Sequence, residues 1–386
     1  MSELYDIFRR HPRISTDTRR IEPGSVFFAL HGATFDGNRF AADALSKGAA
    51  YAVVDDPAAV IGDRTVLVGD TLEALQELAR KHRRELAIPI LAISGSNGKT
   101  TTKELVSRVL AERFEVYATH GNLNNHIGVP LTLLAMTRDT EFGVVEMGAS
   151  ACGEIALLAS VAEPNYGILT NIGRAHLEGF GGPEGIRRGK GELLDYLAAN
   201  GGRAFVPRED EVLTNMAAER DGLAAEYYSV ALADGIAHHL EGDYNRFNIA
   251  AAMAVGRYFD IDGERIRHAV GSYMPDNNRS QRTETERNTL IVDCYNANPS
   301  SMRASVLNFL AEPAGGRSRR VLILGDMLEL GAWSEQEHRD IVALAGRNPD
   351  TELMLVGGEF ARACTGMEPQ PANTALFPSR EELIAE

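Results

Sequence analysis

Leu91-Ala-Ile-Ser-Gly-Ser-Asn-Gly-Lys-Thr-Thr-Thr102 carries the strongest structural signal in this 386-residue chain. The stretch begins inside an apolar run, Ile88–Ile93, which predicts a buried strand, and Lys99–Arg113 predicts a helix directly after it. Gly95 and Gly98 let the intervening turn approach an anion closely, and a helix N-terminus favours negative charge. A strand, a glycine-rich turn and a helix in this order are typical of a nucleotide phosphate site.

The residues of the turn suit a nucleoside triphosphate. Lys99 supplies a positive charge for the outer phosphates, and Thr100 can place its hydroxyl on Mg²⁺. Ile93 stands where the common pattern has an earlier glycine, so the loop is the shortened form Gly-x-x-Gly-Lys-Thr. An ordinary glycine-rich turn is the alternative interpretation, but the flanking strand and helix meet the structural test for the phosphate pattern.

Composition bounds the class of protein. Hydrophobic content of 44% and charged content of 24% are ordinary for a globular chain, and the length predicts two or three domains. The net charge of −15 argues against nucleic acid as a partner, because no broad basic surface is available for its phosphates. Since no apolar run approaches the roughly 18 residues of a membrane span and no signal pattern opens the chain, we expect a cytoplasmic protein without a membrane span. Cys152, Cys294 and Cys364 show no metal-binding spacing, and we interpret them as buried small hydrophobic residues in a reducing compartment.

The pattern of strands and helices divides the chain into residues 1–84, 85–312 and 313–386. In the first unit we expect strands at Ser25–Leu30, Ala50–Val54 and Thr65–Val68, and helices at Arg39–Lys47 and Thr71–Leu86. The basic run Arg80–Arg84 is interpreted as the solvated last turn of the second helix.

The central unit alternates strands and helices, which predicts a mainly parallel sheet covered by helices. Its strand candidates are Ile88–Ile93, Glu115–Ala118, Gly143–Met147, Tyr166–Thr170, Arg203–Val206 and Leu290–Asp293, with helices at Gly153–Val161 and Pro183–Ala198 among others. After an expected linker at Pro313–Ser318, the third unit has strands at Arg320–Leu324 and Glu352–Val356 and a helix at Ser334–Gly346, and it is short for an α/β domain.

Two central strands end in residues that could bind a metal. Ligands of open α/β sheets sit beyond the carboxyl ends of the strands, so Glu146 is placed to hold Mg²⁺ directly or through water. A charged residue at a strand exit is the alternative. His176 follows the next strand and could bind a metal or phosphate, or be a polar surface residue.

Other segments leave their role open when only the pattern is considered. Lys190 lies near the edge of an apolar helix face, where a solvated cation is the ordinary interpretation. The asparagines of Gly121–Pro130 suit either a polar ligand or local turn hydrogen bonds. Asp293 could accept from a ribose hydroxyl and Tyr295 could stack on a base, while Arg279 could clamp phosphate or simply be solvated.

Together these segments resemble the Mur ligases, the ATP-dependent amide-forming enzymes of peptidoglycan precursor synthesis. Ser94–Thr101 is similar to their nucleotide loop, including the missing early glycine. Gly121–Thr132, Asp293–Met302 and Leu324–Gly331 resemble the branch that adds D-alanyl-D-alanine. The resemblance runs nearly end to end. It implies a three-domain α/β architecture with a central P-loop-type domain built on a mainly parallel sheet and a Rossmann-like C-terminal domain.

The resemblance also implies site residues. The nucleotide loop would be Gly95, Ser96, Asn97, Gly98, Lys99, Thr100 and Thr101, with Lys99 and Thr100 at the phosphates of ATP and at Mg²⁺. Glu146 and His176 would hold a second Mg²⁺. Lys190 would be the lysine that is carbamylated in this family, which replaces the solvated-cation interpretation, because a carbamate is an anion that can help bind the metal.

The remaining roles concern the nucleotide base and the substrates. Asn248 would meet the adenine, Arg279 the phosphates and Asp293 the ribose, and the nucleotide site would also include Tyr295, Asn296 and Asn298. Segments 15–19 and 35–40 would hold the UDP end of the substrate, through Thr16, Asp17, Thr18, Arg19 and Asn38. Asn124 and Asn125 would lie near the muramoyl peptide.

The resemblance implies an enzyme that joins D-Ala-D-Ala to UDP-MurNAc-tripeptide through an acyl phosphate. We expect a monomer, although the sequence itself leaves the oligomeric state open. The third residue of the peptide, diaminopimelate or lysine, is left open. Relatives of this group usually continue for several dozen residues beyond the point matching Glu386, so we expect a truncated or abbreviated C-terminal domain, which bears on dipeptide binding. Asp276–Arg279 also replaces their usual proline-glycine-arginine turn. The alternatives are another amide ligase such as a folylpolyglutamate synthase, a non-catalytic nucleotide-binding protein, and a ligase that is inactive without its tail.

Overall fold

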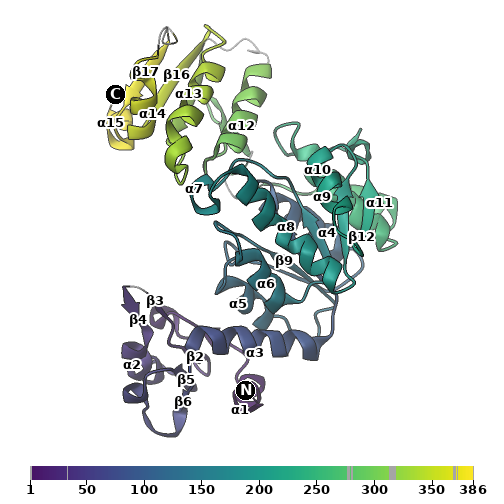
Figure 1. Cartoon of the computed structure of the whole chain (residues 1–386), viewed down its shortest axis with the longest axis vertical. Coiled ribbons are helices and arrows are strands. Elements are labelled where there is room, and N and C mark those ends of the chain that lie inside the picture. The colour runs from purple at the N-terminus through teal and green to yellow at the C-terminus, as the bar shows by residue number, and fades with distance from the viewer. Residues whose placement is uncertain are drawn as a thin grey trace.

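The computed structural model describes residues 2–32, 34–275, 279, 281–312, 319–367, 371 and 373–385. The expected linker at residues 313–318, and residues 276–278 of the turn before Arg279, lie outside the described residues. Three groups of elements follow one another along the longest axis, from the N-terminal unit through the central sheet to the C-terminal unit (Figure 1). This arrangement confirms the expected α/β class with mainly parallel sheets.

The N-terminal unit is built on a parallel sheet with the strand order β1-β2-β5-β6. Its strands are β1 (Ile14–Ser15), β2 (Val26–Phe28), β5 (Tyr51–Val54) and β6 (Thr65–Leu67), with a separate hairpin of β3 (His31–Gly32) and β4 (Phe35–Asp36). Its helices are α1 (Ser2–Arg10), α2 (Ala41–Ser46) and α3 (Thr71–Leu86), with short 3₁₀ turns at Thr18–Arg20, Gly37–Phe40, Pro57–Ala59 and Gly62–Arg64.

Helix α3 joins the first unit to the second and has the predicted bounds. Asp70 caps it by accepting from the Glu73 N–H at 2.8 Å, and its apolar face packs against α5 and α6 of the central unit. The interpretation of its basic end as solvated is wrong for two residues: His82 and Arg83 are buried. Arg83 donates to backbone carbonyls at the end of α6. Because its long side chain reaches these carbonyls, Arg83 is buried between the N-terminal and central units and not solvated.

The central sheet has six parallel strands in the order β12-β11-β10-β7-β9-β8. They are β7 (Ile90–Ser94), β8 (Val116–Ala118), β9 (Phe142–Glu146), β10 (Tyr166–Leu169), β11 (Arg203–Pro207) and β12 (Ala224–Tyr228). Strands β7 and β9 are buried throughout, as continuous apolar strands covered on both faces should be. The register pairs Ile93 with Glu146 and Ser94 with Leu169, so the polar ends of β7, β9 and β10 meet at one edge.

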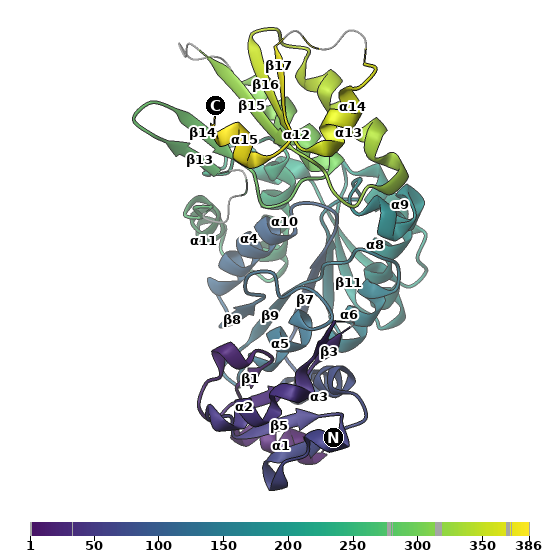
Figure 2. The same ribbon diagram turned by 90° about the vertical axis from the view of Figure 1, so that its left-hand side faces the viewer.

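Helices cover both faces of this sheet (Figure 2). They are α4 (Lys99–Ala111), α5 (Gly128–Leu134), α6 (Glu154–Ala162), α7 (Leu177–Phe180), α8 (Pro183–Ala199), α9 (Glu211–Ala218), α10 (Asn245–Tyr258) and α11 (Gly263–Gly271), with a 3₁₀ turn at Val230–Ala233. One hydrophobic cluster includes Ile90 and Val145 and extends into α3, while Leu91 and Val144 pack on the other face against α4 and α10.

The strand predicted at Leu290–Asp293 does not join the parallel sheet. Strand β14 (Thr289–Val292) pairs with β13 (Gln281–Glu284) in an antiparallel ribbon, with Gln281 opposite Val292. The two strands are joined by a turn in which the Thr285 N–H donates to the Asn288 carbonyl at 2.8 Å. A strand that follows such a turn finds its partner locally, and Leu290 remains exposed.

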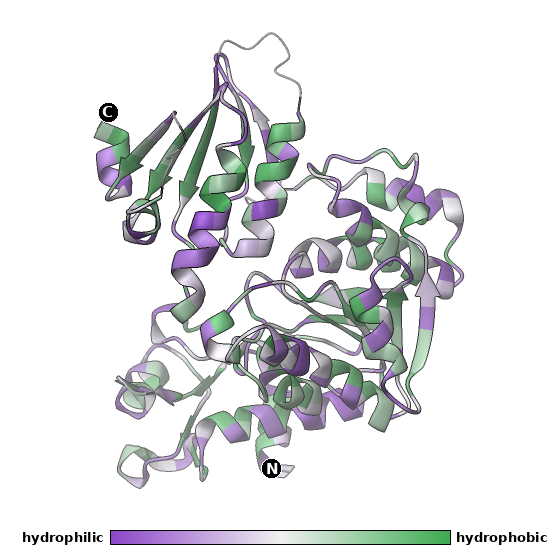
Figure 3. Ribbon diagram, turned by 45° about the horizontal axis from the view of Figure 1, so that its top comes forward, coloured by the Kyte–Doolittle hydropathy of each residue, from purple (hydrophilic) through white to green (hydrophobic). Residues whose placement is uncertain are grey.

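The C-terminal unit has three parallel strands, β15 (Arg320–Gly325), β16 (Thr351–Val356) and β17 (Thr374–Phe377). Its helices are α12 (Pro299–Ala311), α13 (Ser334–Ala345), α14 (Gly358–Cys364) and α15 (Arg380–Ala385), with a 3₁₀ turn at Gly331–Trp333. The strands carry mostly apolar residues, which are green in Figure 3. Helix α12 packs here through Met302 and Val306, although the expected boundary at residue 312 assigned it to the central unit.

Two general expectations about the chain can be compared with the structure. Only Cys364 is a buried cysteine; Cys152 and Cys294 are exposed, so the interpretation of all three as buried is wrong for these two. Among the described residues, no helix combines the length and the apolar character that a membrane crossing requires.

Candidate nucleotide and substrate site

A cavity of about 1000 Å³ lies at the carboxyl edge of the central sheet, where α12 and the loop after β15 approach it. Most of the predicted site residues line it: Ser96, Asn97, Gly98, Lys99, Thr100, Thr101, Asn124, Asn125, Glu146, His176, Asn248, Arg279, Asp293, Tyr295, Asn296 and Asn298. Gly95 and Lys190 are not among the lining residues, and the residues predicted to hold the UDP end lie in the N-terminal unit. The structure therefore brings together residues from segments up to 202 positions apart, from Ser96 to Asn298.

The phosphate loop between β7 and α4 needs its two glycines. Gly95 has φ +133° and Gly98 has φ +77°, values that other residues rarely adopt. A Cβ on Gly95 would lie 2.1 Å from the Thr170 hydroxyl oxygen, and one on Gly98 would lie 2.7 Å from Oδ1 of Asn248. Both glycines therefore permit the loop to pass close to its neighbours and turn into α4, whose N-terminus begins at Lys99.

Lys99 folds back over this loop. Its Nζ donates to the Gly95 carbonyl at 2.8 Å and to the Ser96 carbonyl at 3.1 Å. Burial lowers the pKa of Lys99, the charge of Arg279 lowers it further, and the charge of Glu146 opposes both. A triphosphate would supply the anion that such a partly desolvated ammonium lacks.

Two residues that the sequence analysis did not single out hold the loop in place. Thr170 and Asn171 follow β10 directly; the Thr170 hydroxyl donates to the Asn97 carbonyl, and Oδ1 of Asn171 accepts from the Asn97 N–H at 3.1 Å. The signal for them was present, since they end a buried strand in the same way as Glu146 ends β9. They fix the backbone of the loop from the neighbouring strand.

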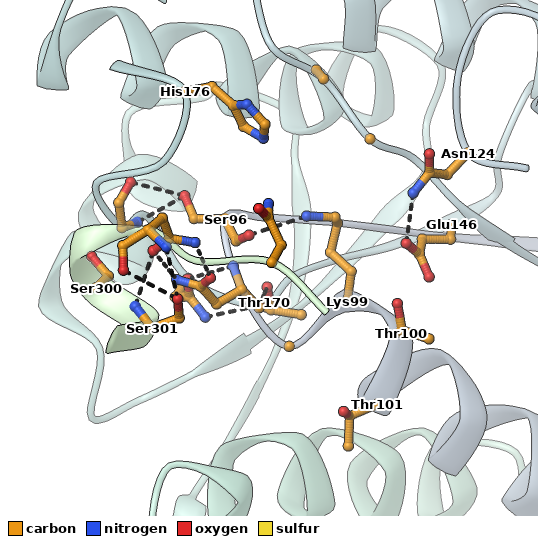
Figure 4. A pocket seen from close by; sticks show the side chains of 18 of the residues that line it. Ser96, Lys99, Thr100, Thr101, Asn124, Glu146, Thr170, His176, Ser300 and Ser301 are labelled. Carbon is orange, nitrogen blue, oxygen red and sulfur yellow. Dashed lines mark hydrogen bonds between the residues drawn. The ribbon is translucent and has the colours of Figure 1, made fainter. Parts of the chain in front are cut away.

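Glu146 projects from the end of β9 into the cavity (Figure 4). One carboxylate oxygen accepts from Nδ2 of Asn124 at 2.8 Å, whereas the other, Oε2, is buried without a hydrogen-bond partner among the residues that the structure describes. A buried carboxylate oxygen without a partner is costly, and a divalent cation is a natural partner for it. The nearby Thr100 hydroxyl lines the same cavity, so the donor set fits Mg²⁺.

In the asparagine-rich segment Gly121–Pro130, Asn124 and Asn125 have different hydrogen-bond partners. Asn124 contacts Glu146, as just described. Oδ1 of Asn125 instead accepts from the Ile127 N–H at 3.1 Å and the Gly128 N–H at 2.9 Å, which is the local turn that the alternative interpretation describes.

Lys190 is buried on α8, so it is not a solvated helix cation. Its Nζ donates to the Ala149 carbonyl at 2.9 Å, and Ala149 itself lines the cavity. Burial, with a further contribution from the charge of Lys99, lowers the pKa of Lys190 well below its ordinary value, and Glu154 and Glu192 oppose this shift. A depressed pKa increases the fraction of neutral amine, which is the form that reacts with CO₂.

Asn248 lines the cavity from α10. Its Oδ1 accepts from the Thr102 hydroxyl at 3.0 Å, and its Nδ2 donates to Oδ1 of Asn245 at 2.8 Å. These bonds orient the amide beside Gly98, at the end of the phosphate loop where α4 begins.

The N-terminus of α12 is fastened to the phosphate loop. Oδ1 of Asn298 accepts from the Ser301 N–H in a capping box, while its Nδ2 donates to Oδ1 of Asn97 at 2.7 Å. The next residue but one, Ser300, accepts from the Arg174 N–H at 2.7 Å. Asn298, the N-cap residue of α12, therefore connects the segment after β14 to the phosphate loop.

The residues predicted for the ribose and phosphates lie on the same side. The Arg279 guanidinium lies over the Tyr295 ring, 3.8 Å from its centroid, and Tyr295 is otherwise exposed. Asp293 accepts from the Ser305 hydroxyl, and Oδ1 of Asn296 accepts from the Ala297 N–H at 3.0 Å.

The segment Thr16–Arg19 follows β1, at the carboxyl edge of the N-terminal sheet. Asp17 pairs with Arg19 at 2.8 Å, and these hydrogen bonds lower the pKa of Asp17 to about 2. The Thr18 carbonyl accepts from Nζ of Lys47 at 3.1 Å. Their position beyond a strand end suits a ligand, as in other α/β sheets.

Asn38 has a structural role in the same unit. Its Nδ2 donates to Asp55 at 2.7 Å and to Asp36 at 3.1 Å, and its Oδ1 accepts from the Asp55 N–H at 3.1 Å. The amide is 8% exposed and fully engaged, so any contribution to UDP binding would come through the loop that it holds.

Three family models match the chain in succession. They are the Mur ligase family, catalytic domain, at residues 12–83, the Mur ligase middle domain at residues 93–235, and the Mur ligase, glutamate ligase domain, at residues 278–386.

Individual proteins are similar over most of the chain. The UDP-N-acetylmuramoyl-tripeptide–D-alanyl-D-alanine ligase of Bacillus subtilis is 35% identical over 354 residues, covering 86% of this chain and 77% of the relative. The enzyme of the same name from Escherichia coli is 33% identical, covering 97% of this chain and 88% of the relative. The crystal structure of MurF from Acinetobacter baumannii superposes with a TM-score of 0.86 at 29% identity, over 97% of this chain and 85% of that one.

Proposed function

This chain belongs to the Mur ligase family, and from that premise we propose that it is an ATP-dependent ligase that joins D-alanyl-D-alanine to UDP-N-acetylmuramoyl-tripeptide in peptidoglycan precursor synthesis. One observation in the structure carries the assignment: a phosphate loop and a buried carboxylate with an unpartnered oxygen line the same cavity. The relatives at 33–35% identity are named as D-Ala-D-Ala ligases, which favours this substrate over the folyl substrate of the alternative.

The proposed reaction has two group-transfer steps, and neither step changes an oxidation state. The terminal carboxylate of the tripeptide attacks the γ-phosphorus of ATP, the bond to ADP breaks, and an acyl phosphate forms. The amine of D-Ala-D-Ala then attacks the acyl carbon, phosphate leaves with the bonding electrons, and the nitrogen loses a proton. Phosphorylation is needed because a free carboxylate would have to expel oxide.

The residues of this chain contribute mainly position and charge. Lys99 and the N–H groups of the phosphate loop would neutralise the phosphates and align them with the carboxylate. When bound, Mg²⁺ would screen the charge between nucleotide and carboxylate. Thr100 and Glu146 are proposed as its ligands, and Glu146, His176 and a carbamylated Lys190 are proposed for a second ion.

Other assignments accompany this proposal. Asn248, Arg279, Asp293, Tyr295, Asn296 and Asn298 are proposed for the nucleotide, with Asn124 and Asn125 near the peptide, and segment 16–19 with Asn38 for UDP. The division at residues 84 and 312 is supported by the separate sheets, although α12 favours a second boundary before Pro299. We also propose that the enzyme is a monomer and that it works in the cytoplasm, where ATP is available.

The test measures phosphate release from ATP with UDP-MurNAc-tripeptide, with and without D-Ala-D-Ala, and identifies the product by mass. We expect dipeptide-dependent release together with the pentapeptide product. Lys99→Ala should abolish it, whereas Arg108→Ala, which removes an exposed charge from the same helix, should not. Turnover with a different acid and amine, but not with these two substrates, would overturn the proposal.

A further inference from the structure

His176 meets a carboxylate that comes from another unit of the chain. Its Nδ1 contacts Oε2 of Glu329, and the two residues are 153 positions apart. His176 lies between β10 and α7 of the central unit, whereas Glu329 lies between β15 and α13 of the C-terminal unit. Both side chains line the large cavity, so this contact forms part of its wall.

The backbone holds both partners in position. His176 has φ +54° and Glu329 has φ +60°, a left-handed conformation that is uncommon away from glycine. Beside the side-chain contact, the Glu178 N–H donates to the Glu329 carbonyl at 3.1 Å. The loop that carries Glu329 is therefore docked on the loop that carries His176 by main-chain as well as side-chain contacts.

A second ion pair joins the same two units of the chain. Nε of Arg174 lies 2.9 Å from Oε1 of Glu337, a carboxylate on α13 that is 5% exposed. This pair keeps the two units together independently of Glu329. Removal of the Glu329 carboxylate alone should therefore leave the docking in place.

The contact between His176 and Glu329 can determine which ring nitrogen of His176 carries the proton. A neutral histidine binds a metal through the lone pair of one ring nitrogen while the other nitrogen carries a proton, and that proton is commonly donated to a carboxylate. Because a carboxylate can only accept, a neutral His176 ring in this contact carries its proton on Nδ1, which leaves the lone pair on Nε2. Figure 4 shows the ring of His176 projecting into the cavity from the side opposite Thr100 and Thr101.

We propose that Glu329 is a positioning residue for His176: it fixes the Nδ1–H tautomer and aims Nε2 into the cavity for a divalent cation. The C-terminal unit thereby orients one ligand of a cation site whose proposed ligands all belong to the central unit. This inference rests on the proposed metal role of His176, and it makes cation affinity depend on whether the two units are docked.

The first readout needs neither metal nor activity. In full-length protein with ¹⁵N-labelled histidine, the ring resonances of His176, assigned by their loss in His176→Gln, should show a protonated Nδ1 and an unprotonated Nε2. Glu329→Ala should shift them toward a tautomer mixture, whereas Glu329→Gln, whose amide oxygen still accepts, should largely keep the wild-type pattern. An unchanged pattern in Glu329→Ala would overturn the proposal.

The second readout is the affinity for Mn²⁺, followed by electron paramagnetic resonance in the presence of a non-hydrolysable ATP analogue. We expect Glu329→Ala to weaken binding about 10- to 100-fold, as loss of an orienting carboxylate commonly does, and Glu329→Gln to weaken it less. Glu335→Ala, which removes an exposed carboxylate from α13, is the matched control and should bind as the wild type does.

The variants separate the possible failures. If His176→Ala leaves Mn²⁺ affinity unchanged, the metal role of His176 and this inference both fail. If His176→Ala weakens binding and Glu329→Ala does not, only the positioning role fails. If Gln is as harmful as Ala at position 329, Glu329 is a direct ligand and the positioning role is again wrong. Thermal unfolding of each variant shows whether the units remain folded.

Discussion

Asn124 donates to one oxygen of the Glu146 carboxylate at 2.8 Å, while the other oxygen of Glu146 is buried and has no hydrogen-bond partner in the described part of the chain. The amide fixes the rotation of the carboxylate and therefore the direction in which the free oxygen points. A bond of this kind to a charged group contributes more than one between neutral groups, so the pair sets the geometry of the proposed cation site.

Asn124→Ala should raise the Mg²⁺ concentration needed for half-maximal ATP turnover. Hydrogen bonds to charged groups contribute about 1.5–3 kcal/mol, which corresponds to a shift of roughly 10- to 100-fold. Asn125→Ala is the control: it removes a turn that precedes α5 and should cost about 1 kcal/mol of stability while leaving the Mg²⁺ dependence unchanged. Equal Mg²⁺ dependence in Asn124→Ala and the wild type would contradict the orienting role.

Glu146→Gln should remove the stabilisation that Mg²⁺ and an ATP analogue give to the folded protein. A ligand present at about 100 times its Kd stabilises the native state by about 2.7 kcal/mol, so differential scanning calorimetry would detect the loss. Without ligands the variant should be at least as stable as the wild type, because it no longer buries an unpartnered anionic oxygen. Asp139→Asn, an exposed substitution in the same unit, should retain the full effect; a similar loss there would mean that the assay reports charge alone.

Gly95→Ala should abolish nucleotide binding. The added methyl carbon would lie 2.1 Å from the Thr170 hydroxyl oxygen, in addition to the strain of a positive φ. Gly121→Ala separates the two effects, because Gly121 has φ +55° but no atom of the described residues within 4 Å of an added Cβ. Both variants should lose about 1–2 kcal/mol from backbone strain, and only Gly95→Ala should fail to bind a fluorescent ATP analogue.

Local sequence was sufficient to predict the elements around the phosphate loop. Thr71–Leu86 has the predicted helix bounds because a capping aspartate precedes it and apolar residues recur at helical spacing. The helix after Gly98 and the buried strands before it and at Phe142–Glu146 were likewise predictable, since one short segment contains the whole signal. The position of Glu146 at the cavity could be predicted for the same reason, because it ends such a strand.

Contacts between distant segments could not be predicted from local patterns. The amides of Asn97 and Asn298 are 201 positions apart, and no spacing rule links them. The antiparallel pairing of β14 was missed because its apolar run looks the same as that of a parallel strand. The contact of Glu329 with His176 depends on how two units dock, which only the folded structure specifies.

Lys190 should form a carbamate with dissolved CO₂. Its amine is buried beside the Ala149 carbonyl and its pKa is depressed by that burial, which favours the reactive neutral form. Incubation with ¹³C-bicarbonate should give a carbamate resonance that is absent in Lys190→Arg. Lys103→Arg, a change at another buried lysine, should retain the resonance. If the wild type gives no such signal, the proposed anionic role of Lys190 is wrong.

The stability of the joint around α3 should depend on pH through His82. Burial lowers the pKa of His82, and a hydrogen bond to the Met136 carbonyl only partly opposes this effect. Nε2 of His82 lies 2.9 Å from that carbonyl and must donate to it, which leaves Nδ1 to accept from the Tyr5 hydroxyl at 3.3 Å. The folded protein therefore holds the neutral ring, whereas the unfolded chain binds a proton near pH 6.5. Stability from this residue is complete above pH 6.5 and is lost as the pH falls from there toward the lowered pKa of the folded state.

Urea unfolding between pH 5 and pH 8 tests this expectation. The free energy of unfolding of the wild type should decrease as the pH falls below 6.5, and His82→Gln should show a smaller decrease, because glutamine does not titrate. His268→Gln, at an exposed position on α11, should follow the wild type. A wild-type slope that persists in His82→Gln would assign the acid sensitivity to other groups. A smaller slope in His82→Gln would assign the acid sensitivity to the buried ring of His82 near the end of α3.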